Sequence, residues 1–381
     1  MDLGCTFGGA GETPVAIQSV ILPRMLMVIF GAGASYDSAQ AYPLIYPGGG
    51  AYPSALKPTR EPWRPPLAKE LFLDHDHYFG HIVENYGKLT HILPYLRQPT
   101  GGKTVEEVLE TLLAESKGNP ETKKELASVR FYLCQLRHQI TEKWHSQTNG
   151  ATNYAPLIRE ILLSNKSNEP VCLVTFNYDL LLEHALYTFG FKVSQPNVQY
   201  DSHSILKLFK LHGSVGWARI VDAPSGTRME PQALIETADT LKLTDDFVLA
   251  NPTDFMQFHQ HGRPIFPAIA MPVQTKTEEF FECPSSHRKK LCELLKLVNK
   301  VLIIGWQAKE AHFTQIPRSN LPPLQHICVV GSDGPDANKT LIHFMREIGQ
   351  STYSTAKSYP SPGRFTDFIV NAHGKDFLEA R

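Results

Sequence analysis

The side chains best suited to chemistry in this sequence follow two short apolar runs. VCLVTF (171–176) leads into Asn177 and Asp179, and the run that ends at Leu211 leads into His212. Polar residues just beyond the carboxyl ends of buried parallel strands lie where such sheets bind ligands. A neutral imidazole in this position can remove a proton near pH 7. We therefore take Asn177 and His212 as candidate catalytic residues and Asp179 as a candidate binding residue, with helix capping and a structural histidine as the alternatives.

A third segment, VIFGAGASYDS (28–38), has the residue types of a pyrophosphate-binding turn. Glycines after a strand allow a sharp turn and a close approach of the backbone to the ligand, whose charge suits the amides at the start of a helix. The dinucleotide fingerprint G-x-G-x-x-G is incomplete, because position 36 is Tyr. The segment therefore predicts either a nucleotide-binding turn or a tight strand-to-helix turn without a ligand. The candidate binding residues are Gly31, Ala32, Gly33 and Ser35.

Apolar runs that alternate with helical patterns must position these residues. Runs typical of buried strands cover 25–30, 171–176, 205–213, 301–306 and 326–331. Helical patterns cover 125–146, 153–164, 180–190, 285–299, 335–348 and 365–371. This alternation predicts an α/β fold with a Rossmann-like, mostly parallel sheet that has helices on both faces.

The remaining segments suggest how the chain is organised around this sheet. We expect residues 1–24 to be a flexible arm and residues 25–381 to form one domain. The residues from about 67 to 165 are predicted to be a helical insertion between the first and second core strands. Residues 39–66 predict an irregular loop, and 266–276 predict an extended, proline-marked connection.

Composition and charge are those of an ordinary globular protein. Hydrophobic residues make up 42% of the chain, charged residues make up 20%, and the formal net charge is -1. No global field therefore favours nucleic acid or an anionic membrane. The six cysteines include no C-x-x-C pair, which argues against a disulfide framework or a four-cysteine zinc site. Because no secretory signal or membrane-spanning run is evident, we expect a cytoplasmic protein.

Several other motifs favour structural roles. TGGKT (100–104) is similar to a P-loop, but Arg97 occupies the position of its first glycine and no buried strand precedes it. The Asp and His residues of 74–81, and the pair His259 and His261, lack the spacing of metal ligands. We therefore expect neither an ATP site nor a metal site at these positions.

The three candidate segments, with G-A-G-A-S, T-F-N-Y-D and K-L-H-G-S in that order, resemble the NAD-binding core of the sirtuin superfamily. The similarity extends to GWQAKEAHF (305–313) and GSDG (331–334), and it covers about two-thirds of the chain. Closer still is the bacterial SIR2-like branch of anti-phage defence, which shares these segments and a proline-marked segment like 266–276. Protein-deacylating sirtuins differ by their paired zinc cysteines, by a glutamine at the position of Phe176 and by the loop that follows Ser35. The resemblance thus implies NAD+ hydrolysis rather than protein deacylation.

The resemblance also implies a role for each candidate residue. Asn177 would orient the ribose and the attacking water, His212 would act as the base, and Asp179 would hold the nicotinamide carboxamide. The diphosphate would lie on the glycine turn. The adenosine half would contact Gly305, Gly331, Ser332 and Asp333. NAD+ would be the substrate, and no metal is expected.

Partners and a biological role follow from the same resemblance. It implies a homo-oligomeric enzyme that depletes NAD in abortive infection, similar to the SIR2-like subunit that is paired with a HerA-type hexameric DNA-translocating ATPase. DNA would be reached only through that ATPase, and no membrane contact is expected. The alternatives are a non-hydrolysing NAD or ADP-ribose binding module, a protein deacylase, and a nuclease component of a translocase complex.

Overall fold

The computed structural model describes residues 25–38, 64–73, 79–148, 150–165, 168–191, 196, 205–222, 230–250, 263–273, 281–350 and 356–380. Its largest element is a six-stranded sheet with the strand order β3-β2-β1-β7-β8-β9, and every neighbouring pair is parallel. These strands are β1 (Met25–Phe30), β2 (Val171–Thr175), β3 (Leu206–Lys210), β7 (Val298–Ile304), β8 (His326–Val330) and β9 (Lys357–Pro360). The predicted α/β fold with a parallel sheet is confirmed.

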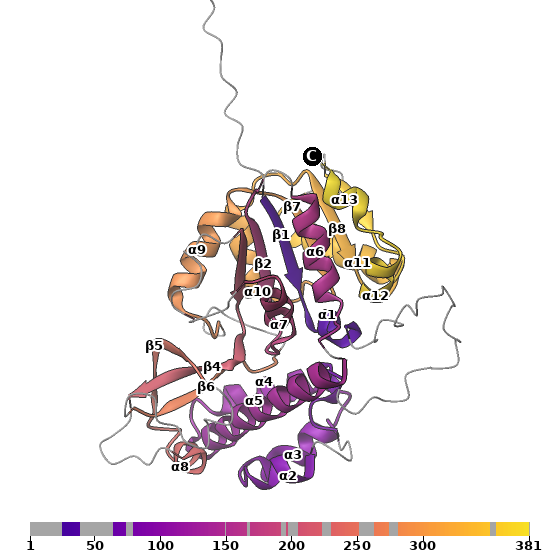
Figure 1. Ribbon diagram of the computed structural model, residues 1–381. Coiled ribbons are helices and arrows are strands. Elements are labelled where there is room, and N and C mark those ends of the chain that lie inside the picture. Colours follow the sequence, from indigo (N-terminus) through magenta and orange to yellow (C-terminus); the bar gives the residue numbers. More distant parts are fainter. Residues whose placement is uncertain are drawn as a thin grey trace, which may run out of the picture.

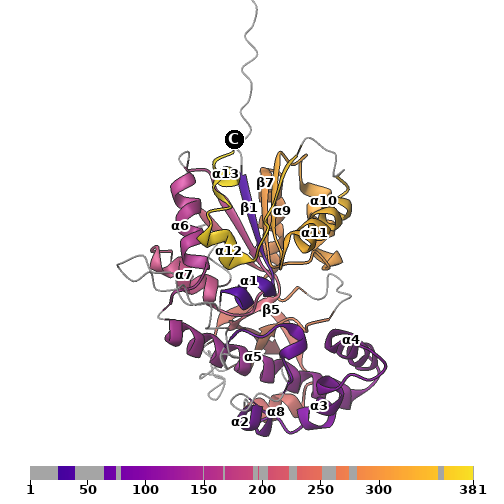
Figure 2. The same cartoon turned by 90° about the vertical axis from the view of Figure 1, so that its right-hand side faces the viewer.

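Helices cover both faces of this sheet (Figure 2). One face carries α6 (Tyr154–Ser164), α7 (Leu181–Thr188), α12 (Phe365–Val370) and α13 (Lys375–Glu379). The other face carries α9 (Ser285–Leu295), α10 (Ala311–Asn320) and α11 (Gly334–Glu347). Strand residues such as Val28, Leu173 and Leu302 are buried in the same hydrophobic core. Burial on both faces explains why these strands form continuous apolar runs in the sequence.

The chain changes direction across the sheet between β1 and β7. From β1 it continues to β2 and β3 on one side, and from β7 it continues to β8 and β9 on the other. Such a switch point leaves a crevice beyond the carboxyl ends of the strands, where parallel sheets bind ligands. The short helix α1 (Ala32–Asp37) begins there, directly after β1. The fold therefore brings the candidate segments that follow β1, β2, β3, β7 and β8 to one edge of the sheet.

A second layer lies opposite this edge (Figure 1). It combines the helical layer, defined here as η1 and α2–α5, with an antiparallel sheet of strand order β5-β4-β6. The helical layer consists of η1 (Ala68–Glu70), α2 (Phe79–Glu84), α3 (Leu89–Arg97), α4 (Val105–Glu115) and α5 (Pro120–Thr148). The small sheet consists of β4 (Gly213–Asp222), β5 (Lys242–Leu249) and β6 (Ile265–Ile269), with α8 (Pro231–Glu236) between β4 and β5. Both parts contribute to one hydrophobic core, which includes Leu89, Tyr132 and Phe266.

Helix α6 lies with the six-stranded sheet rather than with the helical layer. Its Tyr154, Leu157 and Ile158 are buried in the core of the large sheet, and α6 packs beside α7. The residues between β1 and β2 thus supply α1 and α6 to the large sheet and most of the second core's helical side through the helical layer. Within the described residues, no helix combines the length and apolarity that a membrane span requires.

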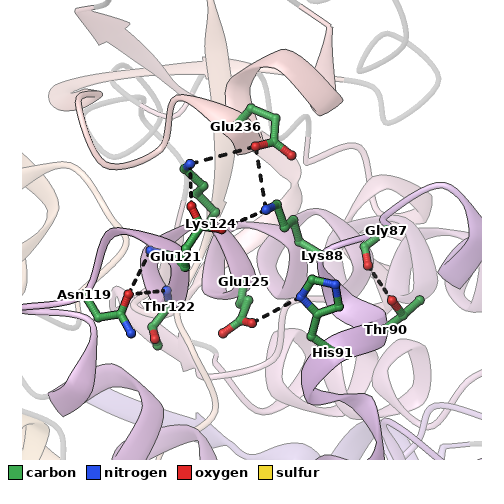
Figure 3. Close-up of polar contacts among 10 residues, drawn as sticks. All are labelled: Gly87, Lys88, Thr90, His91, Asn119, Glu121, Thr122, Lys124, Glu125 and Glu236. Carbon is green, nitrogen blue, oxygen red and sulfur yellow. Dashed lines mark hydrogen bonds and ion pairs between the residues drawn. The ribbon is translucent and has the colours of Figure 1, made fainter.

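Ion pairs join the helical layer to the small sheet. Glu282 is 3% exposed and accepts from Arg130 of α5 at 2.7 Å and from Arg219 of β4 at 3.2 Å. A more exposed network of lysines and glutamates connects the start of α3 and the start of α5 to α8 (Figure 3). Exposed pairs stabilise a protein little, whereas the loss of one partner from a buried pair is costly. The contacts of Glu282 are therefore the stronger connection.

Two segments differ from their sequence-based predictions. The range 266–276, predicted as an extended connection, begins inside β6 of the small sheet. Pro267 fits there because β6 is an edge strand, which tolerates a residue without an N–H. The helix predicted at 285–299 ends at Leu295, because β7 already begins at Val298.

Candidate functional site

A cavity of about 970 Å³ lies between the carboxyl edge of the six-stranded sheet and the helical layer. Its lining includes every candidate residue except Asp333, which instead caps α11 by accepting from the backbone N–H of Asp336 at 2.8 Å. The candidate residues in the lining are Gly31, Ala32, Gly33, Ser35, Asn177, Asp179, His212, Gly305, Gly331 and Ser332. Residues from five strand ends thus meet in one space.

Asn177 is bonded to the turn after β1. Its side-chain amide donates to the carbonyl oxygen of Gly31 at 2.9 Å and to Ser35 Oγ at 3.0 Å. The hydroxyl of Tyr154 lies 3.2 Å from the same nitrogen. Asn177 therefore does not cap α7, whose N-cap is Leu180. These contacts fix the plane of the amide at the edge of the cavity.

Asp179 combines a place in the cavity lining with a role at the start of α7. Its carboxylate accepts from the backbone N–H of Leu181, the first residue of α7, at 3.2 Å, although the N-cap position itself belongs to Leu180. Buried Lys210 of β3 donates to the carbonyl oxygen of Asp179 at 2.5 Å and pairs with Glu183 at 2.6 Å. Burial raises the pKa of Glu183, and the nearby Lys210 opposes that shift. The ion pair thereby anchors the loop between β2 and α7.

Tyr154 belongs to this site although sequence analysis did not select it. It is the first residue of α6, it is buried, and its hydroxyl lies 2.8 Å from Ser35 Oγ. Burial raises the pKa of this phenol well above its usual value, so the hydroxyl stays neutral. No spacing in the sequence indicates Tyr154, because its place depends on how α6 packs on the sheet.

His212 occupies the corner between β3 and β4. Its ring packs against Phe176 with 4.8 Å between ring centroids. Its Nε2 lies 3.4 Å from Nε2 of His312 in α10, and the two rings are within 17° of parallel. The next residue, Gly213, has a φ of +84°, and a Cβ there would lie 1.9 Å from the carbonyl oxygen of Ala268. Only glycine permits this corner, which places the imidazole in the cavity lining.

The glycines at the ends of β1 and β7 pack against each other. A Cβ at Gly31 would lie 2.5 Å from the carbonyl oxygen of Gly305, and one at Gly33 would lie 2.8 Å from the Cα of Gly305. The amides of Gly31 and Gly33 donate to the carbonyl oxygens of Ile304 and Gly305, both at 3.0 Å. The glycine pattern therefore permits the close approach of two strand ends, and two amides of the turn already donate within the protein.

The end of β8 presents an acidic side chain to the cavity. The backbone N–H and the hydroxyl of Ser332 donate to Asp336 Oδ2 at 2.9 Å and 3.1 Å. A Cβ at Gly331 would lie 2.7 Å from the backbone nitrogen of Ala337, so glycine allows α11 to begin close to the strand end. Asp336 lines the cavity. Sequence analysis missed it, and its only signal is its place just after the GSDG segment.

The opposite side of the cavity comes from the helical layer and is rich in basic residues. Arg97 at the end of α3, Lys103 before α4 and Arg137 of α5 all line it. The TGGKT run thus meets the cavity, but it follows a helix, and Thr104 and Glu107 form the capping box that begins α4. Sequence analysis assigned none of these basic residues to the site, because no local pattern shows which side of the sheet a distant helix will cover.

The described residues offer no cluster of side chains suited to a metal ion. Among the described residues, no group of three or more His, Cys, Asp or Glu side chains could hold a metal ion. Residues 74–78 and the pair His259 and His261 lie outside the described residues, as does the side chain of His81. The predictions about those clusters therefore stay predictions.

Comparison with known proteins finds a matching protein family and structurally similar chains. Residues 171–321 match the family described as the SIR2-like domain, and this segment contains Asn177, Asp179 and His212. The chain is also similar to the crystal structure of a Sir2 homologue–NAD complex, with 12% identity over 93% of this chain and 91% of that chain and a TM-score of 0.38. No curated protein matches the chain.

Proposed function

We propose that this chain, whose residues 171–321 match the SIR2-like domain, hydrolyses NAD+ to nicotinamide and ADP-ribose. One observation carries the proposal. Asn177 and His212 follow adjacent parallel strands, and both line the cavity at the switch point of the sheet, together with the glycine turn after β1. This is where a parallel sheet binds a nucleotide, and an amide and an imidazole there suit hydrolysis of a ribosyl bond.

The chemistry assigned to the two residues is simple. The bond between the nicotinamide nitrogen and the ribose carbon breaks, its electron pair leaves with the neutral nicotinamide, and the ribose carbon gains oxocarbenium character. Water attacks that carbon, and His212 accepts the proton that the water loses. The nitrogen of Asn177 is engaged by Gly31 and Ser35, so its amide oxygen is the group that accepts from the water or a ribose hydroxyl.

The rest of the lining supplies binding. Asp179 would accept from the carboxamide of the nicotinamide. The end of β8, with Gly331, Ser332 and the carboxylate of Asp336, would receive the adenosine ribose, whose hydroxyls are good donors to a carboxylate. Gly305 would contribute by keeping β7 close to α1, and the carboxylate of Asp333 by capping α11.

Release of nicotinamide and ADP-ribose from NAD+ by the purified chain, followed by liquid chromatography, tests this function. We predict that Asn177→Ala and His212→Ala each reduce turnover by about 10²- to 10⁴-fold, because each removes a group that acts on the water or the ribose. Matched surface variants, Asn338→Ala and His91→Ala, should keep wild-type turnover because both side chains are exposed. Wild-type rates in both site variants would contradict the assignment, and an acylated ADP-ribose product formed from an acyl-lysine peptide would favour a deacylase instead.

The biological role is proposed from the sequence resemblance. The enzyme would deplete NAD during abortive infection, as a homo-oligomer controlled by a HerA-type hexameric ATPase that contacts DNA. The test compares NAD+ hydrolysis by the chain alone, with the ATPase, and with the ATPase and DNA, alongside the mass of each mixture in solution. A rate and a mass that stay the same in all three mixtures would contradict this control.

A further inference from the structure

Arg137 is a buried cation at the cavity, and it forms no ion pair with the residues that the structure describes. It lies on α5, it is 8% exposed, and it lines the cavity. Its Nε has no hydrogen-bond partner in the part of the chain that the structure describes. The ring centroid of Tyr178 lies 5.9 Å from its guanidinium carbon. Burial lowers the pKa of this guanidinium, and the carboxylate of Asp179 is the largest influence that opposes the shift.

A comparison with buried Lys210 shows that a buried basic side chain in this structure can have an ion-pair partner. Among the described residues, Lys210 is the only other Lys or Arg in the buried class, and it pairs with Glu183 at 2.6 Å. A guanidinium removed from water without an ion pair is costly. A ligand anion that enters the cavity would supply the missing partner. Such uncompensated charges are typical of binding sites rather than of stabilising contacts.

On the opposite side of the cavity, two amides of the glycine turn are not available to an anionic ligand. The amides of Gly31 and Gly33 donate to carbonyl oxygens of the protein, so they do not supply the donors that a diphosphate needs. In the proposed substrate, the diphosphate is the only anionic group. A planar guanidinium can donate two parallel hydrogen bonds to phosphate oxygens.

We propose that Arg137 binds the diphosphate of NAD+ and of ADP-ribose, so that the helical layer completes a nucleotide site built mainly by the six-stranded sheet. The proposal rests on the proposed function, because that function names the ligand. The binding site then spans both layers of the molecule. Diphosphate-bearing ligands should bind only while α5 is docked against the edge of the sheet.

Calorimetric titration of the full chain with ADP-ribose and with adenosine tests this role. We expect Arg137→Gln to raise the Kd for ADP-ribose by about 10- to 100-fold, the usual effect of losing a hydrogen bond to a charged group. The Kd for adenosine, which has no phosphate, should change less than about twofold. Arg137→Lys keeps the positive charge but lacks the planar guanidinium, so its Kd for ADP-ribose should lie between those of the wild type and Arg137→Gln. Arg346→Gln, on the exposed face of α11, is the matched control.

Thermal unfolding of the ligand-free protein gives a second readout. Replacing an uncompensated buried charge by a neutral side chain should leave the Tm of Arg137→Gln at or above that of the wild type. A lower Tm together with equal losses for ADP-ribose and adenosine would mean that Arg137 acts only through the fold, and it would overturn the proposal.

The remaining outcomes separate this proposal from the proposed function. Unchanged ADP-ribose binding by Arg137→Gln overturns the role of Arg137 and leaves NAD+ hydrolysis in place. A wild-type chain that hydrolyses no NAD+ but binds ADP-ribose in an Arg137-dependent way overturns the hydrolysis and supports the diphosphate contact. A wild-type chain that neither hydrolyses NAD+ nor binds ADP-ribose overturns both.

Discussion

The tautomer of His212 is linked to that of its neighbour His312. Their Nε2 atoms face each other at 3.4 Å, and a neutral imidazole has only one N–H. When Nε2 of His212 donates to His312, the proton acceptor of His212 is Nδ1, and the opposite tautomer reverses this arrangement. In the serine-hydrolase triad an aspartate sets the tautomer of a histidine in a comparable way. We therefore expect His312 to be a positioning residue for His212.

We predict that His312→Phe lowers kcat for NAD+ hydrolysis by about 10-fold or more, because the ring packing against Phe281 is kept while the nitrogen contact is lost. KM should change less than about twofold. Steady-state kinetics across a range of pH provide the measurement, and the acid limb of the profile should move in this variant. His312→Gln can still hydrogen-bond and serves as the control. Wild-type kcat with an unmoved pH profile in His312→Phe would rule out the positioning role.

At the scale of single residues, the sequence predicts the groups that follow strands better than the groups that lie on helices. Asn177 and His212 could be selected because an apolar run predicts a strand end, and strand ends of a parallel sheet share one edge. Arg137 lines the cavity from a helix, and Tyr154 and His312 contact lining residues from helices. Only tertiary packing decides which helical residues come this close to the cavity. For Asp179 the alternative was the N-cap of the following helix; the structure gives that position to Leu180, while the Asp179 carboxylate accepts from the N–H of Leu181.

Among the elements, the contact that most constrains the site is the crossing of the end of β7 with the turn between β1 and α1. Gly305 has a φ of +60°, and a Cβ there would lie 2.2 Å from the backbone nitrogen of Ala34. Gly33 donates from its amide to the carbonyl oxygen of Gly305. Because the positive φ and the close approach occur at the same residue, a side chain at position 305 would strain the backbone and also separate β7 from α1.

We predict that Gly305→Ala lowers the free energy of unfolding by about 2 kcal/mol or more, from strain and displacement of the turn. NAD+ turnover should fall as well, because the same turn accepts the hydrogen bonds of Asn177. Urea denaturation measures the first effect. Gly118→Ala is the control, since its Cβ would meet nothing within 4 Å and should change stability by less than about 0.5 kcal/mol. Equal denaturation midpoints for the two variants would contradict this account of the crossing.

The elements also show where sequence patterns stop being informative. The strands of the parallel sheet were predictable because both faces are buried and their sequences are apolar throughout. The small sheet was not predicted because β5 (KLTDDFVL) is half polar and half exposed. In the sequence, α8 separates β5 from its partner β4. No short turn therefore signals that the two strands pair. Pro267 also argues against a strand unless its edge position is known.

For the molecule as a whole, His287 joins the two sheets. It lies in the first turn of α9, is 1% exposed, and packs against Phe209 of β3 and Trp217 of β4. Burial lowers the pKa of His287 to about 4, although its contact with the carbonyl oxygen of Pro196 opposes the shift. A histidine in the unfolded chain has a pKa of about 6.5. Between these two values the unfolded chain binds a proton that the folded protein does not.

This difference gives the stability of the whole molecule a defined pH dependence. The contribution of neutral, buried His287 is fully present above about pH 6.5 and is lost as the pH falls toward about 4, by roughly 1.4 kcal/mol per pH unit and about 3 kcal/mol in all. His287→Gln cannot take up that proton. We therefore predict that the stability difference between wild type and His287→Gln, measured by urea denaturation, is constant from pH 7.5 to about pH 6.5 and shrinks as the pH falls from there to 5. His343→Gln, on the surface of α11, should follow the wild type at each pH. A difference between wild type and His287→Gln that stays constant over this range would mean that protonation of His287 does not control how the two sheets stay joined in acid.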